Sequence, residues 1–140
     1  MTRTIPETVS GTWYYSEPVA SQNGQPRPKL DPEAERGWDE VIDKLLVIRG
    51  YENNWDGEGS RAPQLPLVDS AIRLAITLRE NGERPADFVG ASDGGTVYFE
   101  WISAEGYREI EVINADGAES RWVATGSLTT DVKTLFLRRI

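Results

Sequence analysis

The sequence predicts an α+β domain in which two N-terminal amphipathic helices pack on a four-stranded antiparallel meander, followed by a short C-terminal helix. Apolar residues recur at helical spacing before residue 82 and at a spacing of two from residue 88 onward. A chain of 140 residues suits one such domain, which we place at residues 31–140. Turn signals separate the segments of its second half, at Asp93-Gly94-Gly95, Glu105-Gly106 and Asp116-Gly117.

Residues 1–30 are predicted to be an extended N-terminal arm. Prolines recur there among polar residues and prevent any long regular element, at Pro6, Pro18, Pro26 and Pro28. The exception is Trp13-Tyr14-Tyr15, three adjacent aromatic residues. They predict a short strand packed on the domain, or alternatively an exposed anchor for a partner, and we favour the strand.

Two helices are predicted from caps and apolar stripes. The first starts at Asp31, a good N-cap before Pro32, and ends near Gly50. Its apolar face includes Trp38, which we expect to be core. The second helix starts at Pro66 and ends before Gly82. The remaining members of the two stripes are Val41, Ile42, Leu45, Leu46 and Ile48 or Arg49, then Val68, Ala71, Ile72, Ala75, Ile76 and Leu78 or Arg79.

Four strands are predicted after the helices, at residues 88–91, 96–102, 107–114 and 119–124. Alternation places one apolar face toward the helices and leaves a mixed acidic and aromatic face open. The apolar face contains Val97, Phe99, Trp101, Ile110 and Val112, and the open face contains Tyr98, Glu100, Tyr107, Glu109 and Glu111.

The last segment, residues 127–137, is ambiguous between helix and strand. Ser127 or Thr129 can cap a short helix, whereas Thr129, Thr130 and Thr134 suit a strand almost as well. We predict the helix.

Charge and composition limit the function. With 23 acidic and 15 basic residues, the net charge of -8 argues against direct nucleic-acid binding and against anionic membranes. It favours a basic protein partner, such as one that itself binds nucleic acid. The absence of Cys and His removes thiol nucleophiles, the commonest metal ligand and the usual general base near neutral pH. Without a signal peptide or a membrane-length apolar run, we expect a cytoplasmic protein with no cofactor and no metal.

The glycine-rich loop from Asn54 to Pro63 stands out because it holds Trp55 with two acids, Asp56 and Glu58. Its order resembles the first half of a calcium loop, but Pro63 stands where the bidentate glutamate is required, so we predict no metal there. Trp101 likewise lies beside an acid, Glu100, and the two tryptophans would meet if the loop folded over the edge of the sheet. Both tryptophans can also be ordinary core residues.

The motif Asn54-Trp55-Asp56-Gly57-Glu58-Gly59, followed by Asp93-Gly94-Gly95 and Phe99-Glu100-Trp101, resembles a group of small uncharacterised bacterial and phage-borne proteins. The resemblance covers about residues 50–123. Ser60 departs from the Ala that often follows the second glycine in that group. The group has no established activity, so the resemblance implies a shared pattern and no function.

Two functional hypotheses follow. The first is a non-enzymatic acidic protein-binding module, of the antitoxin, immunity or phage-inhibitor type, that engages a basic protein. The alternative is a carboxylate-dependent hydrolase in which Trp55 or Trp101 is a stacking platform, although no spacing fixes a catalytic pair. The predicted partner-binding residues are Trp55, Asp56, Glu58, Tyr98, Glu100, Tyr107, Glu109 and Glu111.

Overall fold

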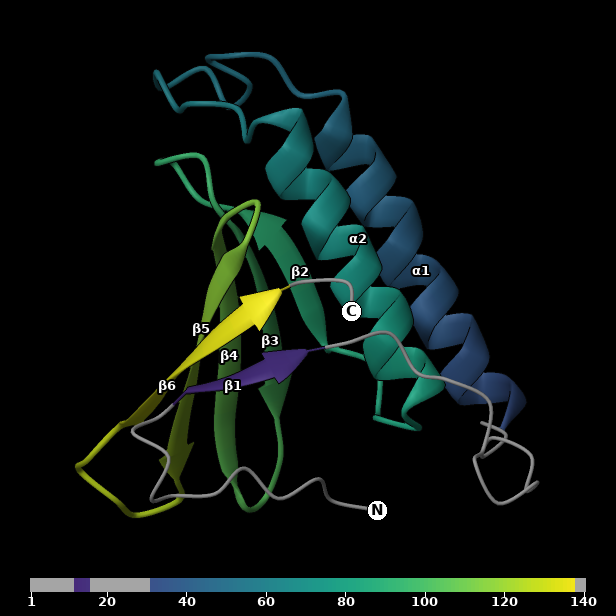
Figure 1. Cartoon of the computed structure of the whole chain (residues 1–140), viewed down its shortest axis with the longest axis vertical. Coiled ribbons are helices and arrows are strands. Elements are labelled where there is room, and N and C mark those ends of the chain that lie inside the picture. Colours follow the sequence, from purple (N-terminus) through teal and green to yellow (C-terminus); the bar gives the residue numbers. More distant parts are fainter. Residues whose placement is uncertain (1–11, 16–30, 138–140) are drawn as a thin grey trace.

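The computed structural model describes residues 31–137 and the backbone of one strand in the arm, β1 (Thr12–Tyr15). Two helices precede the other strands, α1 (Pro32–Arg49) and α2 (Leu65–Glu80). The sheet order is β1-β6-β5-β4-β3-β2, and Figure 1 shows both helices on one side of the sheet. The further strands are β2 (Phe88–Ala91), β3 (Val97–Ile102), β4 (Gly106–Asn114), β5 (Gly117–Ala124) and β6 (Asp131–Leu137).

The predicted α+β class is confirmed, but two parts of the predicted fold are wrong. The antiparallel meander has five strands, β2 to β6, rather than four. The expected C-terminal helix is strand β6, which pairs with β5. Leu135 and Leu137 are both buried, and their spacing of two fits a strand. Pairing with β5 therefore overrode the weak capping signal at Ser127 and Thr129.

The arm contributes β1, which pairs in parallel with β6, from Thr12 opposite Thr134 to Tyr15 opposite Leu137. The backbone of Trp13-Tyr14-Tyr15 thus adopts the strand that we favoured over an anchor. The four prolines of the arm lie outside the described residues.

Helix α1 begins where the sequence indicated. The Asp31 carboxylate accepts a hydrogen bond from the Ala34 N–H at 2.7 Å, and Pro32 occupies the first turn. Trp38 is fully buried, as predicted, and its indole N–H donates to the Glu83 carbonyl at 2.8 Å. Neither described helix is long and apolar enough to cross a membrane.

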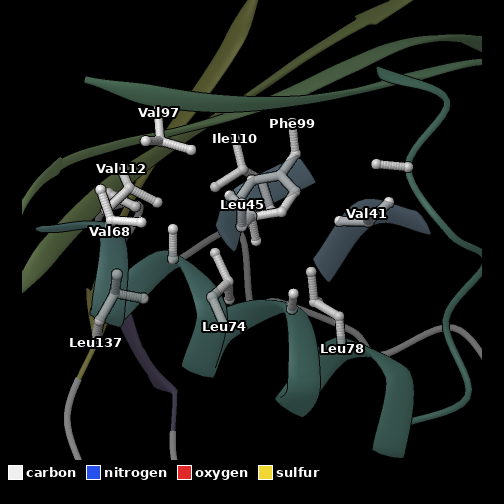
Figure 2. Packing of buried hydrophobic residues seen from close by; sticks show 14 of the residues in the cluster. Val41, Leu45, Val68, Leu74, Leu78, Val97, Phe99, Ile110, Val112 and Leu137 are labelled. Atoms are coloured by element: carbon white, nitrogen blue, oxygen red, sulfur yellow. The ribbon is translucent and has the colours of Figure 1, made fainter. Parts of the chain in front are cut away.

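The core lies between the helices and the inner face of the sheet (Figure 2). Phe99 and Ile110, cross-strand neighbours on β3 and β4, are fully buried together with Leu45 from α1. The predicted apolar face is confirmed, because Val97, Phe99, Trp101, Ile110 and Val112 are all buried. Burial of each such side chain contributes roughly 1.5–3 kcal/mol to folding.

Candidate functional site

The face of the sheet turned away from the helices, here called the outer face, brings five of the eight predicted residues together. Glu100 pairs with Glu109 across β3 and β4, and Tyr98 pairs with Glu111. Tyr107 belongs to the same face, opposite Ile102. The alternation predicted from the sequence therefore places these side chains correctly.

The residue that organises the outer face is Arg121 on β5, which the sequence reasoning missed. One guanidinium nitrogen, Nη1, lies 2.7 Å from Glu109 Oε1 and 3.2 Å from Glu111 Oε1. The other, Nη2, lies 2.5 Å from Glu119 Oε1. Burial alone would lower the pKa of Arg121, but its hydrogen bonds to Glu109 and Glu111 outweigh burial and raise it. Arg121 is therefore a permanent cation between three carboxylates.

A β-bulge at Ile113 explains why Arg121 was missed. Asn114 pairs with Gly117, whereas Val112 pairs with Ala118, so Ile113 is an extra residue on β4. A regular hairpin closed at Asn114 and Gly117 would have turned Arg121 toward the helices. With the bulge, Arg121 pairs with Glu109 on the outer face. The sequence offered one signal for this position, because Arg121 is a basic residue in a predicted strand next to one with two outward glutamates.

Tyr107 connects two of the carboxylates. Its hydroxyl donates to Glu100 Oε2 at 2.8 Å and, more weakly, to Glu109 Oε2 at 3.4 Å. Burial raises the pKa of Tyr107, and the hydrogen bond to Glu100 raises it further. The hydroxyl therefore stays protonated at neutral pH and serves as a donor. Thr96 similarly donates from Oγ1 to Glu111 Oε2 at 2.7 Å.

Among the described residues, the outer face carries an excess of negative charge, because Glu109, Glu111 and Glu119 share the Arg121 guanidinium and Glu100 lies on the same face. Within residues 31–137, Glu100 has a hydrogen bond from Tyr107 and no ion pair. Exposed apolar side chains lie at the same end of the face. Phe88, opposite Glu100 on β2, and Ile102, opposite Tyr107, are each 56% exposed.

Trp55, Asp56 and Glu58 lie elsewhere, in the loop between α1 and α2. The Asp56 carboxylate accepts hydrogen bonds from the Ser60 hydroxyl and from the N–H of Glu58 at 3.0 Å. These bonds lower the pKa of Asp56, with Ser60 contributing most. Asp56 thus closes its own loop as a turn-forming residue, while the Glu58 side chain is exposed.

The aromatic residue of this loop also has a local partner. Trp55 stacks on Tyr51 with ring centroids 4.8 Å apart, and its indole N–H donates to the Arg61 carbonyl at 3.2 Å. The loop is joined to the turn between β2 and β3 by a hydrogen bond from the Arg61 N–H to the Asp93 carbonyl.

The two tryptophans with acidic neighbours are not brought together. Trp101 lies at the far end of β3 from the turn that the Trp55 loop contacts, roughly 20 Å away by strand length. It is also a buried inner-face residue, so Glu100 and Trp101 point to opposite sides of the sheet. The carboxylates of the outer face therefore have neither tryptophan as a stacking platform.

Two cavities, of about 240 and 260 Å³, are lined by none of the eight predicted residues. Within the described part of the chain, no group of three or more acidic side chains is placed to hold a metal ion. The outer face is thus the place where most predicted residues converge.

Comparison of the chain with protein-family models, with curated proteins and with solved structures found no match in any of the three.

Proposed function

We propose that this chain is a non-enzymatic protein-binding module, of the antitoxin, immunity or phage-inhibitor type, whose outer face engages a basic protein. The observation that carries the proposal is the charge imbalance of that face, where three glutamates share Arg121 and Glu100 has no ion pair within residues 31–137. Such a face attracts a cationic partner over several ångströms and accelerates association, an effect that salt screens.

The composition of the outer face supports the same proposal. Glu100 supplies a carboxylate that is fixed by Tyr107 and has no cation within the described residues. Phe88 and Ile102 supply exposed apolar area beside it. Aromatic and apolar anchors next to fixed charges are the arrangement that contributes most to protein–protein binding energy.

The test is a charge reversal at Glu100, because reversal at Glu109 or Glu111 would place a second cation beside Arg121. Glu40, exposed on α1, provides the matched control, since Glu40→Lys changes the net charge equally but away from the sheet. A basic protein captured by the wild-type chain would be identified and purified. Its association rate would then be measured with wild type, Glu100→Lys and Glu40→Lys at low and high salt.

We expect Glu100→Lys to slow association several-fold at low salt and to weaken its salt dependence, because the reversed charge lies within the docking face. Glu40→Lys should change the rate much less. Equal rates for the two variants would mean that only total charge matters, and an unchanged rate with Glu100→Lys would place the partner on another surface.

A further inference from the structure

The cavity of about 260 Å³ lies at the end of the sheet formed by the turn between β3 and β4, on the side that faces the helices. Segment 81–87, which follows α2, forms its other wall. The lining residues are Glu83, Arg84, Trp101, Ser103, Glu105, Arg108 and Trp122. None of them belongs to the outer face.

The walls of this cavity are fixed by two indole donors. The Trp38 N–H donates to the Glu83 carbonyl at 2.8 Å, and the Trp101 N–H donates to the Arg84 carbonyl at 2.8 Å. Tryptophans from α1 and from β3 thus hold consecutive carbonyls of the same segment. A guest would meet a wall that is already ordered, which lowers the entropic cost of binding.

Arg108, one of the lining residues, shows how a cation can be held at a tryptophan ring beside a carboxylate. The Arg108 guanidinium lies over the Trp101 ring, 4.8 Å from its centroid, and Arg108 Nη1 lies 3.0 Å from Glu83 Oε1. Arg84 is likewise paired, with Asp87 at 3.1 Å. Both cations in the lining therefore have a carboxylate of their own.

Trp122 and Glu105 are lining residues that have no cation paired with them among the described residues. Trp122 is the cross-strand neighbour of Arg108 on one side and of Asp131 on the other. Within residues 31–137, its half-buried ring has no stacking, cation or hydrogen-bond partner, and neither Glu105 nor Asp131 has an ion pair. Asp131 and Lys133 lie on the same face of β6, and neither lines the cavity.

We propose that this cavity receives a lysine or arginine side chain of the basic partner, which stacks on Trp122 while its charge faces Glu105. A tryptophan face beside a carboxylate attracts a cation through the ring quadrupole and through the ion pair. The inference rests on the proposed function, since it supplies a second contact for the same basic partner.

The first experiment needs no partner. The 15N-labelled full chain is titrated with a blocked Gly-Arg-Gly peptide and with the same peptide carrying citrulline, a neutral side chain of the same shape. We expect the arginine peptide to produce a saturable shift of the Trp122 indole signal and of the Glu105 and Gly106 amides. Binding of roughly millimolar affinity fits a single side chain, and citrulline should bind at least about fivefold more weakly.

Variants then separate the ring from the charge. Trp122→Ala should weaken the arginine peptide about fivefold, Trp122→Phe should weaken it less, and Glu105→Gln about twofold. Trp55→Phe, in the loop between α1 and α2, is the matched control and should bind as wild type does. Because Trp122→Ala can also perturb folding, the comparison of arginine with citrulline on the wild-type chain decides the result.

The proposal is overturned if both peptides shift the Trp122 signal equally, or if the arginine peptide shifts only outer-face amides around Glu100. These outcomes are independent of the function proposed above. The outer-face proposal fails if Glu100→Lys leaves the association rate of the partner unchanged. The proposal for the Trp122 cavity fails if the wild-type chain does not prefer the arginine peptide to the citrulline peptide at Trp122.

Discussion

Replacing Arg121 with glutamine should destabilise the protein more than any other single removal of a charge from the sheet. The variant loses ion pairs with Glu109, Glu111 and Glu119 and leaves these carboxylates next to one another. Exposed ion pairs contribute about 0.2–1 kcal/mol each, whereas removing one partner of a fully buried pair costs about 3–5 kcal/mol. The side chains involved are 23–37% exposed, so we expect an intermediate loss of about 2–3 kcal/mol.

The assay is equilibrium urea denaturation followed by tryptophan fluorescence. Arg36→Gln provides the matched control, because Arg36 is exposed on α1 and the change in net charge is the same. A surface substitution of that kind should change the free energy of unfolding by less than about 0.5 kcal/mol. At about 1 M salt, where the screening length is only about 3 Å, the loss in Arg121→Gln should shrink because repulsion between the carboxylates is screened.

A double-mutant cycle with Glu111→Gln tests the physical cause. Glu111→Gln removes one of the carboxylates that repel each other in Arg121→Gln, so the double variant should lose less than the two single variants added together. If Arg121→Gln destabilises no more than Arg36→Gln, the guanidinium does not organise the outer face and the reasoning from its three contacts is refuted.

Three further predictions follow from the described contacts. Phe99→Ala should lower the free energy of unfolding by roughly 3–5 kcal/mol, because Phe99 is fully buried. Phe88→Ala, on the exposed end of β2, should change it by less than about 1 kcal/mol, and urea denaturation of both variants measures the difference. Gly106→Ala should cost about 1–3 kcal/mol, since a Cβ would lie 2.3 Å from the Val123 carbonyl, and a melting curve matching wild type would contradict this. The pKa of Asp56 is lower in the folded chain than in the unfolded chain, so the ionised carboxylate stabilises the loop above the ordinary pKa near 3.9. This stabilisation is lost as the pH falls further. The chemical shift of the Ser60 amide should follow the titration of Asp56 and should stay constant over the same pH range in Asp56→Asn.

The parts of the fold with strong local signals could be predicted from the sequence. Asp31 and Pro32 fixed the start of α1, and the three-four spacing identified Trp38 and Leu45 as core. The alternation around Phe99 assigned the inner and outer faces of β3 and β4 correctly. These features depend on residues close together in the chain, and local pattern is sufficient to read them.

The errors occurred where distant pairing decides the structure. Whether residues 131–137 form a strand depends on β5 offering an edge, and residues 127–130 do not contain that information. The position of Arg121 depends on one extra residue in β4, and a count of alternating positions cannot reveal it. The hydrogen bond from the Ser60 hydroxyl to the Asp56 carboxylate likewise depends on the folded loop, and the local pattern did not reveal it.

The extra residue at Ile113 gives the chain an uneven tolerance to changes in length. Deleting Ile113 would leave Val112 opposite Ala118 and Asn114 opposite Gly117, so the bulge would become a regular ladder and every side chain of β5 and β6 would keep its side. Arg121 would stay opposite Glu109, and Leu135 would stay opposite Ala118. Likewise, the connection at residues 125–130 carries the fully exposed Leu128 and can gain or lose residues without altering which residues of β5 and β6 pair. The chain should therefore tolerate a deletion at Ile113 better than a deletion within β5, since loss of Ser120 would move Arg121 opposite Ile110 on the inner face.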